Sequence, residues 1–391
     1  MNSLVHSFRR EARRLLASPW DLAMVSWVPL LAVLLMGWIF SAGLPRHLPV
    51  GVLDDDHSAL SRQLVRMLDA TPGLQVVQHY ANTAEAERAL RSVEVYAVVT
   101  LPRDFARTVK QGRTAQVTLL HNAQLGTHSG VLQRDVRAVV GTLSAGIEMA
   151  ARNKRGEPAQ AVRVSMEPIH TQLLALFNVS TNYEQFLGAA LIPALLHILA
   201  MTAGAWTVGR ELRDRTLGEW LGTDGGVLRT GAALLGKLAL PWASLTLVAL
   251  LALAGITWGR GWHPPGNLAW VAAGLALLMA VSVAAGAALA GLTRSLRTAL
   301  SGAGFFAAPA FAFSGVGFPL AGMPASARAW AEAMPYTHYI RLQIEQLQMG
   351  APLRTSVSTV VALALATALL LAICTLALHL ARSRPESWGG R

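Results

Sequence analysis

Long stretches without charged residues constrain this chain more than any other feature of its sequence. Six runs of 22 to 33 residues contain no Asp, Glu, Lys or Arg. A helix needs about 20 such residues to cross a bilayer core, where only helices satisfy their own backbone. The sequence therefore predicts an α-helical polytopic membrane protein with six transmembrane helices. The runs lie between Asp21 and Arg46, Glu184 and Arg210, Lys237 and Arg260, Arg260 and Arg294, Arg297 and Arg328, and Arg354 and Arg382.

The composition excludes the main soluble classes. Only 14% of the 391 residues are charged, against about 25% in an ordinary soluble domain. The net charge of +11 could indicate nucleic acid as a partner, but the basic residues are diluted by the apolar runs, so we expect no nucleic-acid binding. Cys374 is the single cysteine, so it can form no intramolecular disulfide.

The basic residues next to the predicted spans give an orientation. Fourteen of them fall on one face and four in the two shorter loops of the other face. By the positive-inside rule, both termini face the cytoplasm across the inner membrane, and residues 45–185 lie outside. The fourteen are Arg9, Arg10, Arg13, Arg14, Arg210, Arg213, Arg215, Arg229, Lys237, Arg294, Arg297, Arg382, Arg384 and Arg391.

This orientation divides the chain into five parts. We expect a cytoplasmic amphipathic helix over 1–20, a first transmembrane helix over 21–44, and an extracytoplasmic domain over 45–185. A bundle of five helices follows over 186–382, and a cytoplasmic tail over 383–391. The external segment alternates strand and helix patterns, which predicts an inserted α/β domain. Its expected strands are 48–53, 74–80, 93–101 and 115–120, and its expected helices are 59–68, 84–90, 104–110 and 129–153, the last ended by a turn at 156–158.

The cytoplasmic segment over 209–230 mixes charges with apolar anchors. Leu212, Leu217, Trp220 and Leu221 would form one side of a short amphipathic helix, which presents Trp220 and Leu221 to a partner or to the membrane. A solvated loop is the alternative reading, since charge runs are usually only solvated. Trp and Arg are enriched where binding energy concentrates, which favours docking.

The Arg residues within 4–16 have two readings. They either meet anionic headgroups or only set the orientation of the chain in the membrane.

Three patterns that suggest chemistry fail on inspection. Residues 231–237 have the spacing of a phosphate-binding loop, but Leu238 replaces the metal-binding Ser or Thr and the glycines enter a span. Asp54, Asp55 and Asp56 precede Ser58 and fit helix capping better than cation binding. The eleven His residues show no metal-ligand spacing. We therefore expect no enzyme activity, no metal and no cofactor in this chain.

His197 is the one titratable residue near the centre of a predicted span. Ionisable groups inside a membrane are functional candidates, so His197 is a candidate pathway residue. A neutral His bonded to a neighbouring helix is the structural alternative.

The segment after the fifth predicted run contains helix-breaking prolines at membrane depth. Residues 313–324 read Phe-Ser-Gly-Val-Gly-Phe-Pro-Leu-Ala-Gly-Met-Pro, and residues 334–339 read Met-Pro-Tyr-Thr-His-Tyr. Such backbone is tolerated only where it is buried or lines a cavity, which predicts a re-entrant gate over 314–340. The predicted gate residues are Ser314, Gly315, Phe318, Pro319, Met323, Pro324, Pro335 and Tyr336.

This series resembles the last external loop of the permease subunits of type-2 ABC exporters. Residues 17–20 (Ala-Ser-Pro-Trp) resemble the elbow helix of that family, and residues 48–58 the start of its external domain. Glu211, Thr216, Gly218, Gly236 and Lys237 resemble its coupling loop, although Asp214-Arg215-Thr216 departs from the usual Arg-Gly-Thr order.

The resemblance implies export powered by a separate ATPase subunit that holds the ATP and magnesium. It implies a dimer with a second permease copy or a paralogue, membrane lipids as neighbours, and a periplasmic adaptor as a candidate partner. The substrate is expected to be amphiphilic. ATPase coupling would fall to Glu211, Leu212, Thr216, Leu217, Trp220 and Leu221. The alternative is a membrane-anchored receptor or assembly factor that binds a ligand through its external domain.

Overall fold

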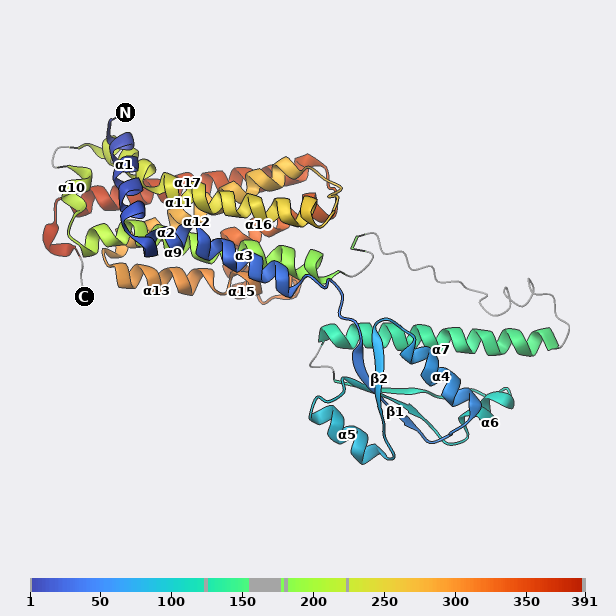
Figure 1. The fold of residues 1–391 in the computed structure, drawn as a ribbon. Helices are drawn as coiled ribbons and strands as arrows, with labels where there is room; N and C mark the ends of the chain where they lie inside the picture. Colours follow the sequence, from blue (N-terminus) through green and yellow to red (C-terminus); the bar gives the residue numbers. More distant parts are fainter. Residues whose placement is uncertain (1, 123–125, 155–176, 179–181, 223–224, 389–391) are drawn as a thin grey trace. The chain divides into compact units, whose positions relative to one another are not determined.

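A computed structural model describes the chain except for residues 1, 123–125, 155–176, 179–181, 223–224 and 389–391 (Figure 1). The chain divides into two compact units. Met1–Gly43 and Ala175–Arg391 form a helical unit, and Leu44–Leu174 form an α/β unit.

The α/β unit is built on a four-stranded sheet in the order β2-β1-β3-β4. Strand β1 (Leu48–Asp54) pairs in parallel with β2 (Leu74–His79) and with β3 (Ala97–Leu101), whereas β4 (Thr118–His121) runs antiparallel to β3. Helices α4 (Ala59–Asp69), α6 (Phe105–Lys110) and α7 (Gly126–Lys154) contribute to one apolar core, and α5 (Thr83–Arg91) to a second. A strand or helix of the expected kind lies at each of the eight expected places, but β3 begins at Ala97 and β4 at Thr118, both later than the sequence pattern predicts. The expected turn at 156–158 lies outside the described residues.

Strand β3 starts later than predicted because the chain turns before it. Val93 has a φ of 60°, a left-handed conformation that strains a β-branched residue and ends any strand. Ser58 caps α4 by accepting a bond from the N–H of Ser61, as the capping prediction requires. Asp54, the last residue of β1, instead accepts bonds from the backbone N–H groups of Asp56 and His57 at 3.0 and 3.1 Å, in the turn before the helix.

Among the residues that the structure describes, four helical segments of the helical unit are long and apolar enough to cross a membrane. They are η1–α9 (Glu184–Arg213), α11–η2 (Val227–Gly259), α12 (Leu268–Thr293) and α17 (Leu353–Arg382). Helices α2 (Pro19–Val25) and α3 (Trp27–Ile39) are bent by 41° and count as a fifth span if taken together.

The prediction of six spans is not met, because the run between Arg297 and Arg328 folds into short pieces. Helix α13 (Leu296–Ala307) stops before Pro309, and α14 (Ala310–Phe313) has only four residues. A turn, a 3-10 helix (Leu320–Gly322) and α15 (Ala325–Ala333) follow, then α16 (Pro335–Gln343), which π-helix η4 (Ile344–Gln348) continues. Pro lacks the backbone N–H that a continuing helix needs and clashes with the preceding turn. Counting uncharged residues cannot detect such breaks.

Two glycines allow the central helices α9 and α12 to pack closely. A Cβ on Gly204 would overlap the carbonyl of Val283, and a Cβ on Gly286 would overlap that of Met201. Small residues at such crossings are the usual way for apolar helices to associate, because dispersion contacts replace the hydrophobic effect.

Candidate functional site

Helix α1 (Asn2–Ala17) lies directly against α11, and a glycine makes this approach possible. A Cβ on Gly236 would overlap the backbone carbonyl of Leu4, so any larger residue would push α1 away. Lys237, the next residue, is therefore enclosed between helices, and its side chain is fully buried. A buried ammonium is stable only if it is paired.

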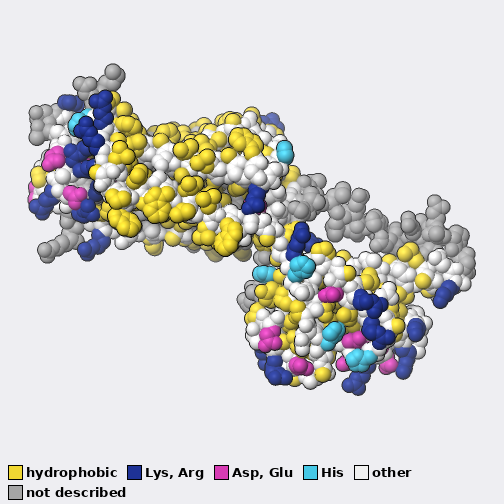
Figure 2. Space-filling model, in the orientation of Figure 1, with side chains coloured by type: hydrophobic (Ala, Val, Ile, Leu, Met, Phe, Trp, Pro, Cys, Tyr) yellow, Lys and Arg dark blue, Asp and Glu magenta, His cyan; other side chains and the backbone are white. Residues whose placement is uncertain are grey.

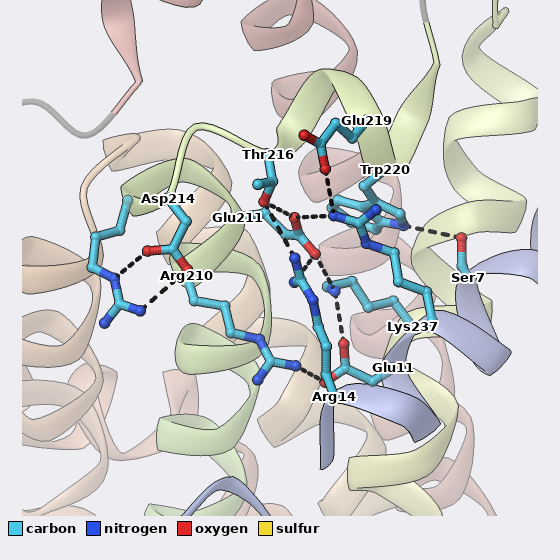
Figure 3. A network of polar contacts seen from close by, with 12 residues as sticks. Ser7, Glu11, Arg14, Arg210, Glu211, Asp214, Thr216, Glu219, Trp220 and Lys237 are labelled. Carbon is cyan, nitrogen blue, oxygen red and sulfur yellow. Dashed lines mark hydrogen bonds and ion pairs between the residues drawn. The ribbon is translucent and has the colours of Figure 1, made fainter. Parts of the chain in front are cut away.

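Two buried carboxylates supply that pairing (Figure 3). The Nζ of Lys237 donates to Glu11 of α1 at 2.7 Å and to Glu211 of α9 at 2.6 Å. All three side chains have an exposed fraction of zero. The lysine of α11 thus connects α1 with the last turn of α9.

Arg210 connects these ion pairs to helix α2. Its guanidinium donates to Glu11 and, at 2.5 Å, to Asp21 of α2. Asp21 also accepts a bond from the indole N–H of Trp206 at 2.8 Å. Both carboxylates therefore have more than one donor, as buried charges require.

Glu211 collects further donors. Arg14 and the Thr216 hydroxyl both donate to it, and Arg10 lies 3.3 Å away. Arg10 also reaches Glu219, a largely exposed residue of α10 (Leu217–Leu221), at 3.4 Å. The contacts of Arg10 thus lead from the buried carboxylate to the surface.

Helix α10 is fixed by its tryptophan. The indole N–H of Trp220 donates to the hydroxyl of Ser7 on α1 at 3.0 Å, and the Nζ of Lys237 lies 4.8 Å from the centre of a Trp220 ring. That distance is within the range of a cation–π interaction. A helix of five residues cannot be stable alone, so these contacts hold α10 in place.

These interactions form one charge-balanced group, which we call the α1 charge cluster. It contains four basic and four acidic residues from α1, α2, α9, α10 and α11. Removing one partner of a buried pair leaves an uncompensated charge, which costs about 3–5 kcal/mol. The cluster therefore joins these helices through side chains whose separation would be costly. Its members are Arg10, Glu11, Arg14, Asp21, Arg210, Glu211, Glu219 and Lys237.

The structure brings the predicted coupling residues together, but it shows that their apolar side chains are buried or half-buried. Leu212, Leu217 and Trp220 are buried, and Leu221 is half-buried. The prediction that Trp220 faces a partner is wrong for this structure, because α1 covers it. The exposed side chains directly before and within α10 are polar: Arg213, Asp214, Arg215 and Glu219. The exposed apolar side chains of this segment are instead Val227 and Leu228, at the start of α11.

Sequence reasoning missed the contribution of α1. It assigned the Arg residues of this helix to headgroups or orientation, but Arg10 and Arg14 turn inward, and only Arg9 and Arg13 are exposed. Ser7, Glu11 and Arg14 are spaced by four and three residues, so they share one helical face. That polar stripe was the signal for a polar partner.

The predicted gate residues occupy the turn after α14 and the start of α16. Ser314, Met323 and Tyr336 are buried, and Pro335 is half-buried. Gly315 has a φ of 89°, a conformation that favours glycine. Phe318, Pro319 and Pro324 are exposed.

Helix α16 supplies a donor that α9 lacks. Pro193 has no N–H, so the carbonyl of Ala189, four residues earlier, loses its helical partner. The side-chain amide of Gln343 donates to that carbonyl at 2.9 Å, and Tyr336 donates to the carbonyl of Ala190 at 2.6 Å. Buried backbone acceptors inside a membrane need such replacements.

His197 lies beside this contact. Its Nδ1 is 2.6 Å from the hydroxyl of Ser282 on α12, and its ring stacks on Tyr336 with centroids 6.4 Å apart. The side chain is buried. This is the geometry of the structural alternative, a histidine bonded to a neighbouring helix.

The other chemical patterns have ordinary structural roles. Residues 231–237 lie inside the continuous helix α11, not in a loop between a strand and a helix, so they cannot surround a phosphate. Among the described residues, no group of three or more His, Cys, Asp or Glu is placed to hold a metal ion.

These features define a polytopic membrane protein in which a short surface helix packs on a group of buried ion pairs between α1 and the spans. The family model described as ABC-2 family transporter protein matches residues 19–376. The chain therefore belongs to the ABC-2 transporter family, which supports the resemblance seen in its last loop and implies an ABC ATPase partner in general. No curated protein matches the chain.

Proposed function

We propose that the chain is the permease subunit of an ABC exporter that a separate ATPase subunit powers. The observation that carries this proposal is the α1 charge cluster, which joins α10, the short helix at the surface, to α1 and to the long segments that contain α9 and α11. A force on α10 would reach α1 through the buried Trp220–Ser7 hydrogen bond and the partly exposed Arg10–Glu219 pair. From α1 it would reach α9 and α11 through the buried pairs of Glu11 with Arg210 and Lys237. ATP and magnesium would be bound by the partner.

In this proposal the ATPase docks on the exposed polar side chains around α10. Arg213 and Asp214 pair with each other at 2.7 Å and both remain exposed, and Glu219 is 69% exposed. Leu212, Leu217 and Trp220 would act behind this surface and hold α10 on the bundle. Closure of the nucleotide site would then bias a two-state arrangement of the helices.

The distribution of charge supports a cytoplasmic position for this surface. Figure 2 shows Lys and Arg gathered at the end of the helical unit that carries α1 and α10, whereas hydrophobic side chains cover its flank. By the positive-inside rule, this end faces the cytoplasm of the inner membrane. The termini would then be cytoplasmic and the α/β unit outside, where a periplasmic adaptor could bind it.

The segment over 314–340 is the proposed gate for an amphiphilic substrate. Its buried residue Tyr336 contacts both α9 and His197, so a shift of α9 would reach it. A second permease copy or a paralogue would complete the pathway. His197 stays a candidate pathway residue.

Coexpression and copurification with ABC ATPase subunits from the same organism test the proposal. The wild-type permease should capture one of them and change its rate of ATP hydrolysis in lipid vesicles. Glu219→Lys together with Asp214→Lys should weaken capture, because both reverse exposed charges at the proposed docking surface.

Glu332→Lys is the matched control, since Glu332 is exposed on α15, far along the chain from α10. Equal loss of capture in the control, or full capture by the double variant, would contradict the docking assignment.

A further inference from the structure

An open hollow lies between α3, α9 and α11–η2, at the end of the helical unit opposite the α1 charge cluster. Its volume is about 500 Å³, within the usual range for small-molecule sites. Its walls are mostly apolar, and include Val33 of α3 and Ile192 of α9. We call this hollow the lateral groove.

Two glycines keep the lateral groove open. A Cβ built on Gly37 of α3 or on Gly255 of η2 (Gly255–Gly259) meets no atom within 4 Å. Neither glycine is therefore needed for close packing against another helix, in contrast to Gly204, Gly236 and Gly286. The space in front of them is free to hold another molecule.

An ion pair borders the same groove. Arg260 lies 3.0 Å from Glu184, and its guanidinium also approaches the carbonyl of Gly37 at 3.4 Å. The side chain of Arg260 is 45% exposed and that of Glu184 only 13%, so the positive group is the more accessible one. A guanidinium has five N–H donors, which leaves Arg260 with donors to spare.

Exposed tryptophans place this rim at the level of a membrane interface. Trp38, at the end of α3, and Trp258, in η2, are 73% and 79% exposed. Tryptophan is enriched where hydrocarbon meets headgroups. The groove beside them is formed by segments that have the length and hydropathy of membrane spans, α3 when taken together with α2, so we expect lipid acyl chains to surround it.

We propose that the lateral groove binds one membrane phospholipid. An acyl chain lies along the apolar wall between Val33 and Ile192, and the headgroup phosphate accepts hydrogen bonds from Arg260. Arginine suits this role because its planar fork matches phosphate oxygens. The site is distinct from the proposed ATPase docking surface and from the proposed gate.

Native mass spectrometry of the full-length, delipidated permease tests the proposal, with palmitoyl-oleoyl phosphatidylglycerol as the probe. The wild type should retain one lipid and should bind diacylglycerol of the same chains more weakly. Gly37→Leu and Gly255→Leu should each lower lipid occupancy about tenfold, because the added side chain fills the space of the acyl chain. Two variants on opposite walls guard against a folding defect in either one.

Arg260→Gln should weaken phosphatidylglycerol binding about fivefold, corresponding to about 1 kcal/mol for one basic residue near a lipid surface. It should leave diacylglycerol binding unchanged. Gly304→Leu and Arg354→Gln are the matched controls. Gly304 also has open space around its Cβ position and Arg354 is exposed, but neither lines the groove.

Three results would overturn the proposal. Wild-type binding by both leucine variants would exclude the groove as the site. Equal affinity of the wild type for diacylglycerol would exclude phosphate recognition. A change in oligomeric state, rather than in lipid occupancy, in the leucine variants would show that a second copy of the chain covers the groove.

Discussion

Both ends of the helical unit contain buried polar groups, but the partners that pair with these groups differ in chemistry between the two ends. At the end with α1, fully charged side chains pair in a connected group, in which Glu11, Glu211 and Lys237 have no exposure. At the opposite end, neutral side chains such as Gln343 and Tyr336 each satisfy one backbone carbonyl. Loss of a charge leaves its partners uncompensated, whereas loss of a neutral donor leaves one acceptor unsatisfied. The α1 end should therefore be the more sensitive and the more cooperative of the two.

Glu11→Ala should give the largest effect. It leaves Lys237 and Arg210 with less compensation in a buried setting, so we expect the permease to lose about 3–5 kcal/mol of stability. Thermal unfolding of the purified protein in detergent measures the change. Glu219→Ala is the control from the exposed rim of the same cluster and should cost less than about 1 kcal/mol. Equal losses in both variants would contradict a buried charge network.

Gly236→Ala should rank second, because its methyl group overlaps the carbonyl of Leu4. We expect a cost of about 1–3 kcal/mol, typical of overpacking, with α1 displaced from α11. Thiol labelling of Ser7→Cys in a Cys374→Ala chain reports that displacement, since Ser7 is buried.

Gly231→Ala is the control for this variant. It lies on the same helix, but its Cβ would make an ordinary contact of 3.4 Å with Thr375. Slow labelling of Ser7→Cys in both variants would contradict the close approach of α1.

Gln343→Leu tests the neutral end and should cost about 1–3 kcal/mol, the penalty of an unsatisfied buried acceptor. Pro193→Ala restores a helical N–H for the carbonyl of Ala189. Gln343→Leu should therefore cost less in a Pro193→Ala background, which a double-mutant cycle of unfolding free energies measures. Strict additivity would show that Gln343 does not replace the missing donor.

Trp220→Phe should have the smallest effect. It removes one neutral hydrogen bond to Ser7 and keeps most of the buried ring, so we expect a loss of about 1 kcal/mol. Ser7→Ala should have a similar effect, and the double variant should be no less stable than either single one. A much larger loss would mean that Trp220 holds α10 through its ring contacts, including that with Lys237, more than through its hydrogen bond.

Much of the fold follows from local pattern. The strands and helices of the α/β unit were predictable from short apolar runs and from helical spacing. In β1, for example, the four consecutive residues 50–53 are all buried. The long spans were predictable from uncharged runs. The uncharged run between Arg297 and Arg328 wrongly predicted one more span. Pro309 and the residues after α14 break this run, and no charged residue marks the break.

The candidate site was only partly predictable. Glu211 and Lys237 were singled out and bond each other directly, but their further partners Glu11 and Arg10 lie on α1, about two hundred residues earlier in the chain. An amphipathic pattern shows that Trp220 needs an apolar cover, and it cannot show whether that cover is another subunit or α1. The polar stripe of Ser7, Glu11 and Arg14 on α1 was a local sign of this contact between distant helices.

The central claim is that the α1 charge cluster transmits movement from α10 to the spans. Spin labels at Trp258→Cys and Phe318→Cys, both exposed positions, in a Cys374→Ala chain report the distance between η2 and the proposed gate. In the complex with its ATPase, ATP binding should change this distance. The change should vanish in Glu211→Gln with Lys237→Met, which removes one buried charge of each sign while the ATPase stays bound. An unchanged response to ATP in that double variant would contradict the account.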